Sequence, residues 1–173
     1  MDLILRELIL TPEDKASFLN GLIEGEAYWK LFAWKPGISY SQLIERQDNF
    51  KWGVNLPAGL VPYTTFYGFV GDVIVGRLSI RHKLNESLEL YGGHIGYVVI
   101  DKYRRRGYAT EMLRQALPIC KDQLGMQRVL LICADDNVAS SRVIQRCGGK
   151  LHSQIWNEEL QKLTRRYWIE LGE

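Results

Sequence analysis

The sequence has little of several features that mark whole classes of protein. It contains three cysteines among 173 residues and no Cys-x-x-Cys pair, which argues against a disulfide framework or a zinc site and for reduced thiols. No apolar run approaches the roughly 20 residues that a membrane-spanning helix needs. The N-terminus carries an acid at position 2 and lacks the basic segment of a signal peptide. We therefore expect a cytoplasmic protein that binds neither a metal ion nor a membrane.

An excess of one charge is also missing. Lysine plus arginine number 22 and aspartate plus glutamate 20, so the net charge is +2. Such a balance gives little attraction for a polyanion, and we expect no nucleic-acid partner. Binding of small acidic ligands is still possible, because it needs only a local site. Apolar residues (46%) and charged residues (24%) occur at ordinary globular levels, and the length suits one domain, which we expect to span 1–173.

The first half of the chain predicts two helices and a group of strands. Thr11-Pro12 is a helix start followed by acids, and Ser39 or Ser41 can cap a second helix. Gly71-Asp72 separates two runs rich in β-branched residues, which indicates a hairpin. The expected elements are a strand at 3–10, helices at 12–26 and 39–49, and strands at 61–70, 73–81 and 94–100.

The second half predicts alternating helices and strands. Apolar residues recur at helical spacing over 109–123, although Pro118 should kink this helix or mark a looser turn. A short apolar strand at 128–134, a helix at 137–147 and strands at 150–156 and 164–171 complete the chain. This order predicts an α+β or α/β domain around one mixed sheet flanked by helices.

Residues 98–112 are the most informative segment. A strand ends, a basic loop turns at Gly107, and a helix begins. The unpaired N–H groups and the dipole of a helix start attract anions, and Arg104, Arg105 and Arg106 add positive charge. An ordinary solvated loop before a helix has the same composition, so the residues alone leave both interpretations open. Neither the P-loop nor the dinucleotide fingerprint is present.

Two motifs resemble those of a known family. Arg104-x-x-Gly107-x-Ala109 resembles the [QR]-x-x-G-x-[GA] pyrophosphate loop of the GNAT superfamily of N-acetyltransferases. Asn137-x-x-Ser140, followed by Gly148, resembles the family's second cofactor segment. The motifs cover about 94–150, and the element order matches the family across nearly the whole chain. The likeness is greatest to the branch with ribosomal-protein N-terminal acetyltransferases, and it implies a mostly antiparallel, twisted central sheet flanked by helices.

The resemblance implies transfer of acetyl from acetyl-CoA to a primary amine, which attacks the thioester directly. In the family, a splayed strand pairs with the pantetheine arm, one of its N–H groups polarises the thioester carbonyl, and the following loop holds the pyrophosphate. Carried over to this chain, the cofactor-binding residues are Val98, Val99, Ile100, Arg104, Arg105, Arg106, Gly107, Tyr108, Ala109, Thr110, Asn137 and Ser140.

The reaction also needs a base for the ammonium group and an acid for the CoA thiolate. His94 is the candidate base, because its ordinary pKa of about 6.5 suits proton transfer near neutrality. A structural histidine that caps the Gly92-Gly93 turn is the alternative. Many family members place a tyrosine acid where this chain has Ile144. Tyr97 is therefore our candidate acid, and Tyr91, Ser140, Ser141 or water are alternatives.

The acceptor pocket is expected from 22–40, 77–94 and 156–166. A cationic amine could bind there through charge or an aromatic ring, although loop aromatics often only pack. The candidate substrate-binding residues are Glu24, Tyr28, Trp29 and Glu89. Two other functions stay open, namely a non-catalytic domain that binds and senses acyl-CoA, and a protein–protein scaffold with a vestigial groove. The closing strands around Tyr167-Trp168-Ile169 are a candidate homodimer surface.

Overall fold

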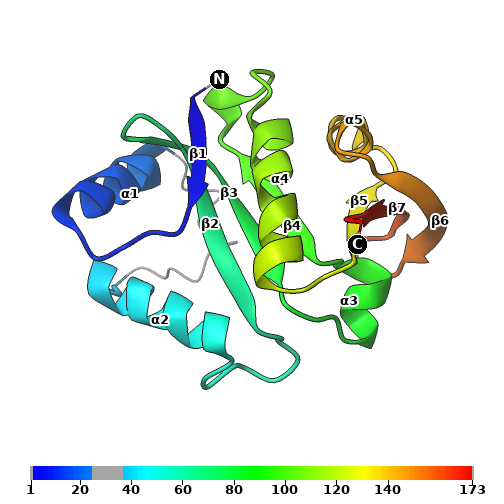
Figure 1. Cartoon of the computed structure of the whole chain (residues 1–173), viewed down its shortest axis with the longest axis horizontal. Helices are drawn as coiled ribbons and strands as arrows, with labels where there is room; N and C mark the ends of the chain where they lie inside the picture. The colour runs from blue at the N-terminus through cyan, green and yellow to red at the C-terminus, as the bar shows by residue number, and fades with distance from the viewer. Residues whose placement is uncertain (1, 25–36, 173) are drawn as a thin grey trace.

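The computed structural model describes residues 2–24 and 37–172 and shows an α+β fold (Figure 1). In chain order its elements are β1 (Leu3–Arg6), α1 (Pro12–Glu24), α2 (Tyr40–Trp52), β2 (Tyr63–Val70), β3 (Val73–Arg81), α3 (Glu86–Tyr91), β4 (Ile95–Val99), the 3-10 turn η2 (Asp101–Tyr103), α4 (Tyr108–Pro118), the π-helical turn η3 (Ile119–Gln123), β5 (Arg128–Ala134), α5 (Val138–Arg146), β6 (Lys150–Asn157) and β7 (Lys162–Glu170).

Local signals in the sequence place most element ends. The Thr11 hydroxyl accepts a hydrogen bond from the Asp14 N–H (3.2 Å) at the start of α1. Ser39, rather than Ser41, caps α2, and it forms a capping box with Gln42. Pro118 ends the α-helical pattern of α4, and the chain continues as the π-helical turn η3, which confirms the looser turn expected there.

Helix α3 was not predicted, because residues 83–93 carry no helical repeat of apolar residues. Its six residues depend instead on a cap, in which the Asn85 side chain accepts a hydrogen bond from the Leu88 N–H (2.9 Å). The helix shortens the polar connection between β3 and β4.

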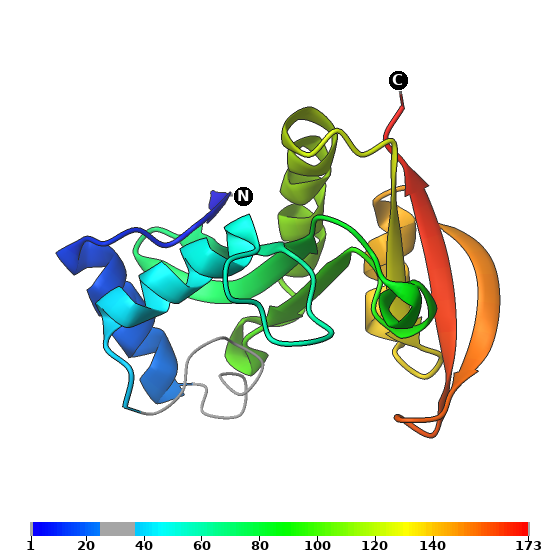
Figure 2. The ribbon, with the colours of Figure 1, turned by 90° about the horizontal axis from the view of Figure 1, so that it is seen from below.

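The strands form two antiparallel sheets, with orders β1-β2-β3-β4 and β5-β7-β6. The sheet predicted as one mixed unit is thus divided between β4 and β5, while the fold class of antiparallel strands flanked by helices is confirmed. The division arises because the backbones of β4 and β5 are not joined by a ladder of hydrogen bonds. The pattern of side chains in the sequence does not reveal which strands pair. Figure 2 shows the two sheets as separate layers.

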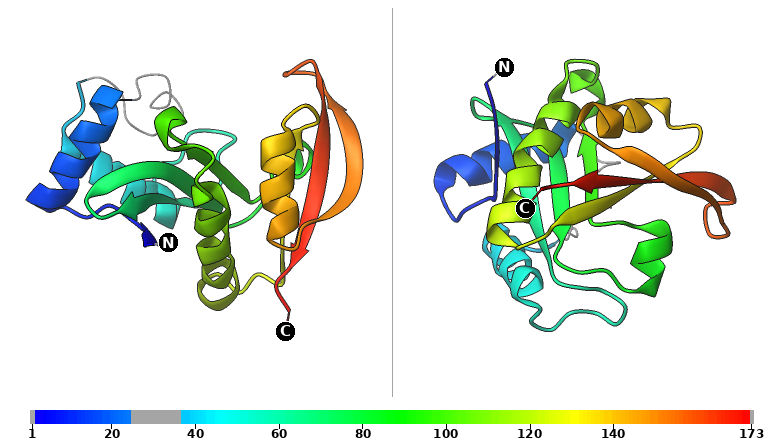
Figure 3. Two further views of the ribbon diagram at one scale, coloured as in Figure 1. Left: turned by 90° about the horizontal axis from the view of Figure 1, so that it is seen from above. Right: turned by 45° about the vertical axis from the view of Figure 1, so that its right-hand side comes forward.

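Helices cover both faces of the four-stranded sheet. Helix α4 packs on one face through Met112 and Leu113, which join a core with Leu78 and Ile80 of β3. Helices α1 and α2 cover part of the other face around Tyr67. Helix α5 lies against the three-stranded sheet and beside α4, as both views in Figure 3 show. In the described ranges, no helix is long and apolar enough to cross a membrane.

Candidate active site

The gap between the two sheets is a cleft that is closed at one end. There, the His94 N–H donates to the Leu130 carbonyl (2.7 Å), and the Leu130 N–H donates to Nδ1 of His94 (2.9 Å). Beyond this point β4 and β5 run in the same direction and diverge around a pocket of about 170 Å³. Its lining comes from β4, β5 and the start of α5: Ile95, Gly96, Tyr97, Leu131, Ile132, Cys133, Asn137, Ser140 and Ile144.

The register of β4 decides which backbone groups face this cleft. The Arg81 N–H donates to the His94 carbonyl (2.8 Å), and the Ile100 N–H donates to the Val75 carbonyl (3.0 Å). Alternate residues of an antiparallel strand bond to the neighbouring strand. With the pairing Arg77↔Val98, the even-numbered residues of β4 therefore bond to β3. The N–H and carbonyl groups of Ile95, Tyr97 and Val99 are turned toward β5.

This register changes one part of the sequence-based prediction. Val98 and Ile100 were expected to offer backbone groups to the pantetheine arm, but these groups are already paired with β3. Val99 keeps the expected orientation, although its carbonyl also accepts a hydrogen bond from Nε of Arg104 (3.2 Å). Tyr97, predicted only for its side chain, presents its backbone as well. Whether the odd-numbered or the even-numbered residues of β4 bond to β3 depends on which residues of the two strands are paired. The sequence does not reveal this pairing.

The basic loop after β4 has an unusual backbone. Arg105 has a φ of 63° and Gly107 a φ of 83°, so two nearby residues adopt the left-handed conformation. Such alternation points successive N–H groups to one side and forms an anion-binding concavity. The Arg104 side chain pairs with Asp101 (2.7 Å) on the surface. That contact leaves the backbone and the other arginines as the groups suited to an anion.

Helix α4 begins directly after Gly107. The Glu111 N–H donates to the Gly107 carbonyl (3.1 Å), so the N–H groups of Tyr108, Ala109 and Thr110 precede the helical hydrogen-bond pattern. The helix dipole adds partial positive charge at the same place. The N–H groups of this helix start and of the loop before it suit a phosphate or pyrophosphate, which is the role that the sequence motif predicts for them.

The second motif reaches the cleft from its other side. Asn137 caps α5, and its Oδ1 accepts a hydrogen bond from the Ser140 N–H (3.0 Å). Both residues line the cleft pocket, so the structure brings the two sequence motifs to one site. Their placement fits contact with a pantetheine arm that lies between β4 and β5.

Tyr97 joins the two walls of the cleft. Its hydroxyl lies 2.8 Å from Oγ of Ser140 and 3.3 Å from the Ser140 carbonyl. Burial raises the pKa of Tyr97 well above its ordinary value, so this hydroxyl keeps its proton at neutral pH. Ile144 is fully buried and lines the same pocket, where it contributes no polar group. The phenolic hydroxyl group in the cleft therefore comes from β4.

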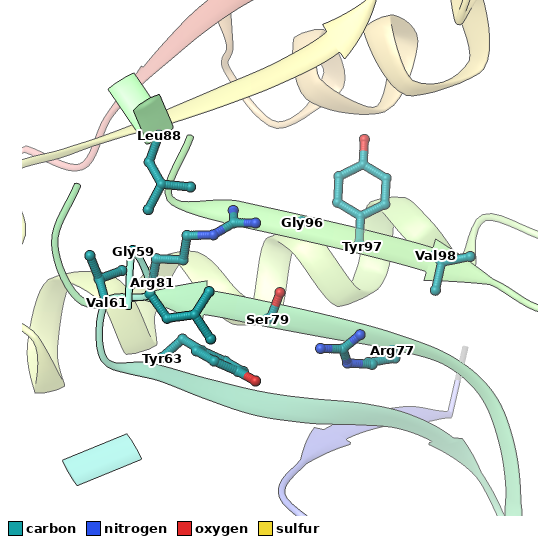
Figure 4. A pocket seen from close by; sticks show the side chains of 11 residues that line it. Gly59, Val61, Tyr63, Arg77, Ser79, Arg81, Leu88, Gly96, Tyr97 and Val98 are labelled. Carbon is teal, nitrogen blue, oxygen red and sulfur yellow. The ribbon is translucent and has the colours of Figure 1, made fainter. Parts of the chain in front are cut away.

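A second pocket of about 390 Å³ lies on the other side of β4. It shares Gly96 and Tyr97 with the cleft, so the two pockets meet at these residues. Figure 4 shows the side chains that line it, from β2, β3, β4, α3 and the loop before β2. The lining residues are Gly59, Leu60, Val61, Tyr63, Arg77, Ser79, Arg81, Leu88, Gly96, Tyr97 and Val98. A molecule in this pocket could reach a group held in the cleft.

His94, the predicted base, lies at the closed end of the cleft. Its Nδ1 already accepts the Leu130 N–H, and its ring lies beside Trp168, with centroids 6.2 Å apart. Burial and the positive charge of Arg81 lower the pKa of His94 to about 4. The residue is absent from the linings of both pockets within the described part of the chain. This geometry favours a structural role that ties β4 to β5, which differs from the predicted cap on Gly92-Gly93.

Of the predicted acceptor-binding residues, only Glu89 has a side chain that the structure describes, and it does not line the second pocket. Glu89 is exposed on α3, and its carbonyl accepts a hydrogen bond from Arg166 (2.8 Å), whereas its neighbour Leu88 lines the pocket. Glu24 ends α1, and nothing is described of its side chain. Tyr28 and Trp29 lie outside the described residues.

The segment 77–94, expected at the acceptor pocket, does line the second pocket, but sequence reasoning did not single out its two arginines, Arg77 and Arg81. Arg77 and Arg81 alternate with Leu78 and Ile80 along β3, and this alternation signals a strand with one polar face. This pattern could have pointed to the two arginines within that segment. In the described residues, no group of three or more histidine, cysteine or acidic side chains is placed to hold a metal ion.

Comparison with known proteins places these features in a family. A family model described as an acetyltransferase (GNAT) domain matches residues 2–150. A search of curated proteins finds no match.

Several solved structures share the fold. A ribosomal-protein α-N-acetyltransferase in complex with coenzyme A has 18% identity and a TM-score of 0.65, over 97% of this chain and 93% of the other. An acetyltransferase from Salmonella typhimurium that modifies the N-terminal serine of a ribosomal subunit protein has 16% identity and a TM-score of 0.64, over 97% and 94%. A spermidine N-acetyltransferase chimera, partly from Vibrio cholerae, has 16% identity and a TM-score of 0.64, over 99% and 96%.

Proposed function

The chain belongs to the GNAT acetyltransferase family and is an N-acetyltransferase, and we propose that it moves the acetyl group of acetyl-CoA to a primary amine that attacks the thioester directly. One observation supports this function most strongly, namely that the cleft and the second pocket meet at Gly96 and Tyr97. An amine in the second pocket would then reach a thioester in the cleft without a covalent enzyme intermediate. We propose that residues 1–173 do this as a single domain.

The residues of the cleft suit the shape and chemistry of coenzyme A. The outward backbone groups of β4 can pair with the amides of a pantetheine arm, as in an added strand. The N–H groups of Arg105 to Thr110 can hold the pyrophosphate, with positive charge from Arg105 and Arg106. Asn137 and Ser140 complete the wall at α5. Bound acetyl-CoA supplies the acetyl thioester.

The backbone of β4 and Tyr97 supply the main catalytic groups in this proposal. An N–H of Tyr97 or Val99 would stabilise the negative charge that develops on the thioester oxygen. The Tyr97 hydroxyl would donate a proton to the leaving thiolate and recover one through Ser140. We assign the deprotonation of the ammonium group to water, because His94 is held at the closed end of the cleft.

Mixing the protein with acetyl-CoA and a panel of amines tests this function. Thiol release should require both the protein and an amine, and mass spectrometry should show one added acetyl group on the amine. Binding of acetyl-CoA in a thermal-shift assay, without transfer to any amine, would favour the non-catalytic sensing domain instead. Failure to bind acetyl-CoA would leave the scaffold interpretation.

A further inference from the structure

One part of the second pocket is an apolar wall, formed by Leu60, Val61 and Leu88. Leu60 and Val61 lie in the loop before β2, and Leu88 lies on α3. Figure 4 shows Val61 and Leu88 toward one end of the pocket and Val98 toward the other. Among the described residues of the lining, every charged side chain comes from β3 instead. The loop and the helix thus present a surface without charge to a bound molecule.

Asn85 holds the two parts of this wall together. Its Oδ1 accepts a hydrogen bond from the Leu88 N–H (2.9 Å) and caps α3. Its Nδ2 donates to the Gly59 carbonyl (3.0 Å), next to Leu60 in the loop. The Leu60 N–H also donates to the Pro57 carbonyl (3.1 Å), which closes the loop into a turn. Because these bonds exist without an acceptor, the wall is formed in advance and needs little ordering when the acceptor binds.

The wall still exposes apolar surface to water. Leu60 is 48% exposed and Leu88 is half-buried, whereas Val61 is only 7% exposed. An apolar group of the acceptor that covers Leu60 and Leu88 removes this surface from water, which favours binding. A polar group at the same place would give up hydrogen bonds to water and gain none from these side chains. The wall therefore discriminates between acceptors by polarity.

The pairing of the strands sets the distance from this wall to the reacting centre. Tyr63 follows Val61 by two residues and is paired with Arg81 of β3. Ser79, two residues before Arg81, is paired with Gly96, where the pocket meets the cleft. Two residues of a strand span about 7 Å, so a group near Tyr63 and an amine at Gly96 are separated by roughly two residues of an extended chain.

We propose that the acceptor carries an apolar side chain within roughly two residues of its primary amine, and that this side chain binds the wall of Leu60 and Leu88, with Asn85 as the positioning residue of the wall. This inference rests on the proposed function, because it names the substrate class of the same site. Two sources share the chemistry, a small amine with an apolar substituent and a peptide with an apolar residue beside its N-terminus. The test must therefore separate them.

Matched acceptors that differ in polarity but hardly in shape provide the test. L-leucinamide is compared with L-asparaginamide, and the peptide amide Ser-Leu with Ser-Asn, with each kcat/KM expressed per unprotonated amine. For at least one pair, kcat/KM with the wild-type protein should be about ten times higher for the leucine member, chiefly through a lower KM. The pair with the larger difference identifies the source of the apolar group.

Truncation of the wall locates the effect. Leu60→Ala and Leu88→Ala should each raise the KM of the leucine member about fivefold and leave the KM of the asparagine member and of acetyl-CoA unchanged. Leu90→Ala is the matched control, because Leu90 lies on the same helix, is exposed and lies outside both pockets. Leu88 also lies against Gly92, so melting temperatures show whether a loss in that variant reflects misfolding, whereas Leu60 lies in an exposed loop.

A separate variant tests Asn85. Asn85→Asp keeps an acceptor for the Leu88 N–H but cannot donate to the Gly59 carbonyl, so α3 stays capped while the loop is released. It should raise the KM of the leucine member several-fold and leave kcat unchanged, because the wall shifts and the reacting centre does not. A KM equal to that of the wild type would overturn the positioning role of Asn85.

The outcomes separate this inference from the proposed function. Equal or faster acetylation of the asparagine members would overturn the apolar-acceptor assignment and leave the acetyltransferase intact. A preference for leucine that persists unchanged in both alanine variants of the wall would also overturn it. Transfer to no member of the panel, with acetyl-CoA still bound, would overturn both.

Discussion

The hydroxyl group of Tyr97 lies 2.8 Å from Oγ of Ser140, so one hydrogen bond joins strand β4 to helix α5 across the cleft. Ile144, at the position where the family resemblance implies a tyrosine acid, lies on the same helix and lines the same pocket. The phenolic hydroxyl group that the helix lacks at this position is thus supplied by the facing strand. This arrangement makes Tyr97 the residue whose removal should affect the chemical step most.

We expect Tyr97→Phe to lower kcat roughly 10- to 100-fold, at or below the lower end of the range for general acids, because a thiolate can leave without full protonation. The KM for acetyl-CoA should change little, since the backbone of β4 is retained. Steady-state kinetics with a thiol-release assay measures both values. Tyr91→Phe is the control, because Tyr91 ends α3 outside both pockets. Equal activity of the two variants would show that Tyr97 is not the acid.

His94 should affect stability in acid more than catalysis. Its pKa is about 4 in the folded protein and about 6.5 when unfolded, so unfolding takes up a proton between these values. The stability that the neutral ring contributes is complete above about pH 6.5 and is lost as the pH falls toward 4. His94→Asn keeps an acceptor for the Leu130 N–H and should flatten this part of the stability curve, measured by urea unfolding between pH 4 and 8.

Two comparisons complete the test of His94. The pKa of His82 is also lowered by burial, so the difference between variant and wild type is informative, rather than the wild-type curve alone. The pH profile of kcat/KM should keep its shape in His94→Asn. Loss of an ionisation from that profile would instead identify His94 as the general base.

The absence of a side chain at Gly107, and not only the backbone conformation of this residue, should be needed for cofactor binding. Gly107→Gln should raise the KM for acetyl-CoA tenfold or more, because a side chain at the start of α4 obstructs the close approach of a phosphate. Gly125→Gln is the matched control, since Gly125 also has a positive φ (64°) and a Cβ there would meet no atom within 4 Å. Both variants should lose about 1–2 kcal/mol of stability from the left-handed backbone. A similar KM in both would show that the loop does not hold the cofactor.

Alanine substitutions at two glycines of the four-stranded sheet should have different effects, one on stability and the other on activity. A Cβ at Gly76 would lie 2.6 Å from the Val98 carbonyl oxygen and 3.0 Å from the Cε of Met112, so Gly76→Ala must push β3 and β4 apart. We expect a loss of about 1–3 kcal/mol in the free energy of unfolding, measured in urea. A Cβ at Gly96 would meet Ser79 at an ordinary 3.7 Å.

Gly96→Ala should therefore leave stability almost unchanged and lower kcat/KM for the acceptor, because it adds a methyl group where the two pockets meet. If Gly96→Ala were as unstable as Gly76→Ala, the strand register would be wrong. If it were as active as wild type, the meeting point of the pockets would not be the reacting centre.

The candidate homodimer surface around Tyr167-Trp168-Ile169 is smaller than the sequence suggests, because Tyr167 and Ile169 are buried in the core of the same chain. The homodimer and the cytoplasmic location stay predictions. Size-exclusion chromatography and cell fractionation would address them.

The sequence by itself determined the local structure and the family. Caps such as Thr11 and Ser39, the glycine turns and the apolar spacings specify helices and strands through contacts between near neighbours in the chain. The phosphate loop around Gly107 could also be read directly, because a strand end, a tight turn and a helix start are adjacent in sequence.

The tertiary structure alone decided how these pieces act together. The backbone groups of Val99 face the cleft because Val99 is paired with Gly76 of β3. A shift of one residue in this pairing would turn the same groups toward β3. The pairing of Tyr97 with Ser140 joins residues 43 positions apart, and the two arginines of β3 meet β4 only after the sheet has formed. Contacts of this range are set by packing of the whole core, which no local pattern in the sequence records.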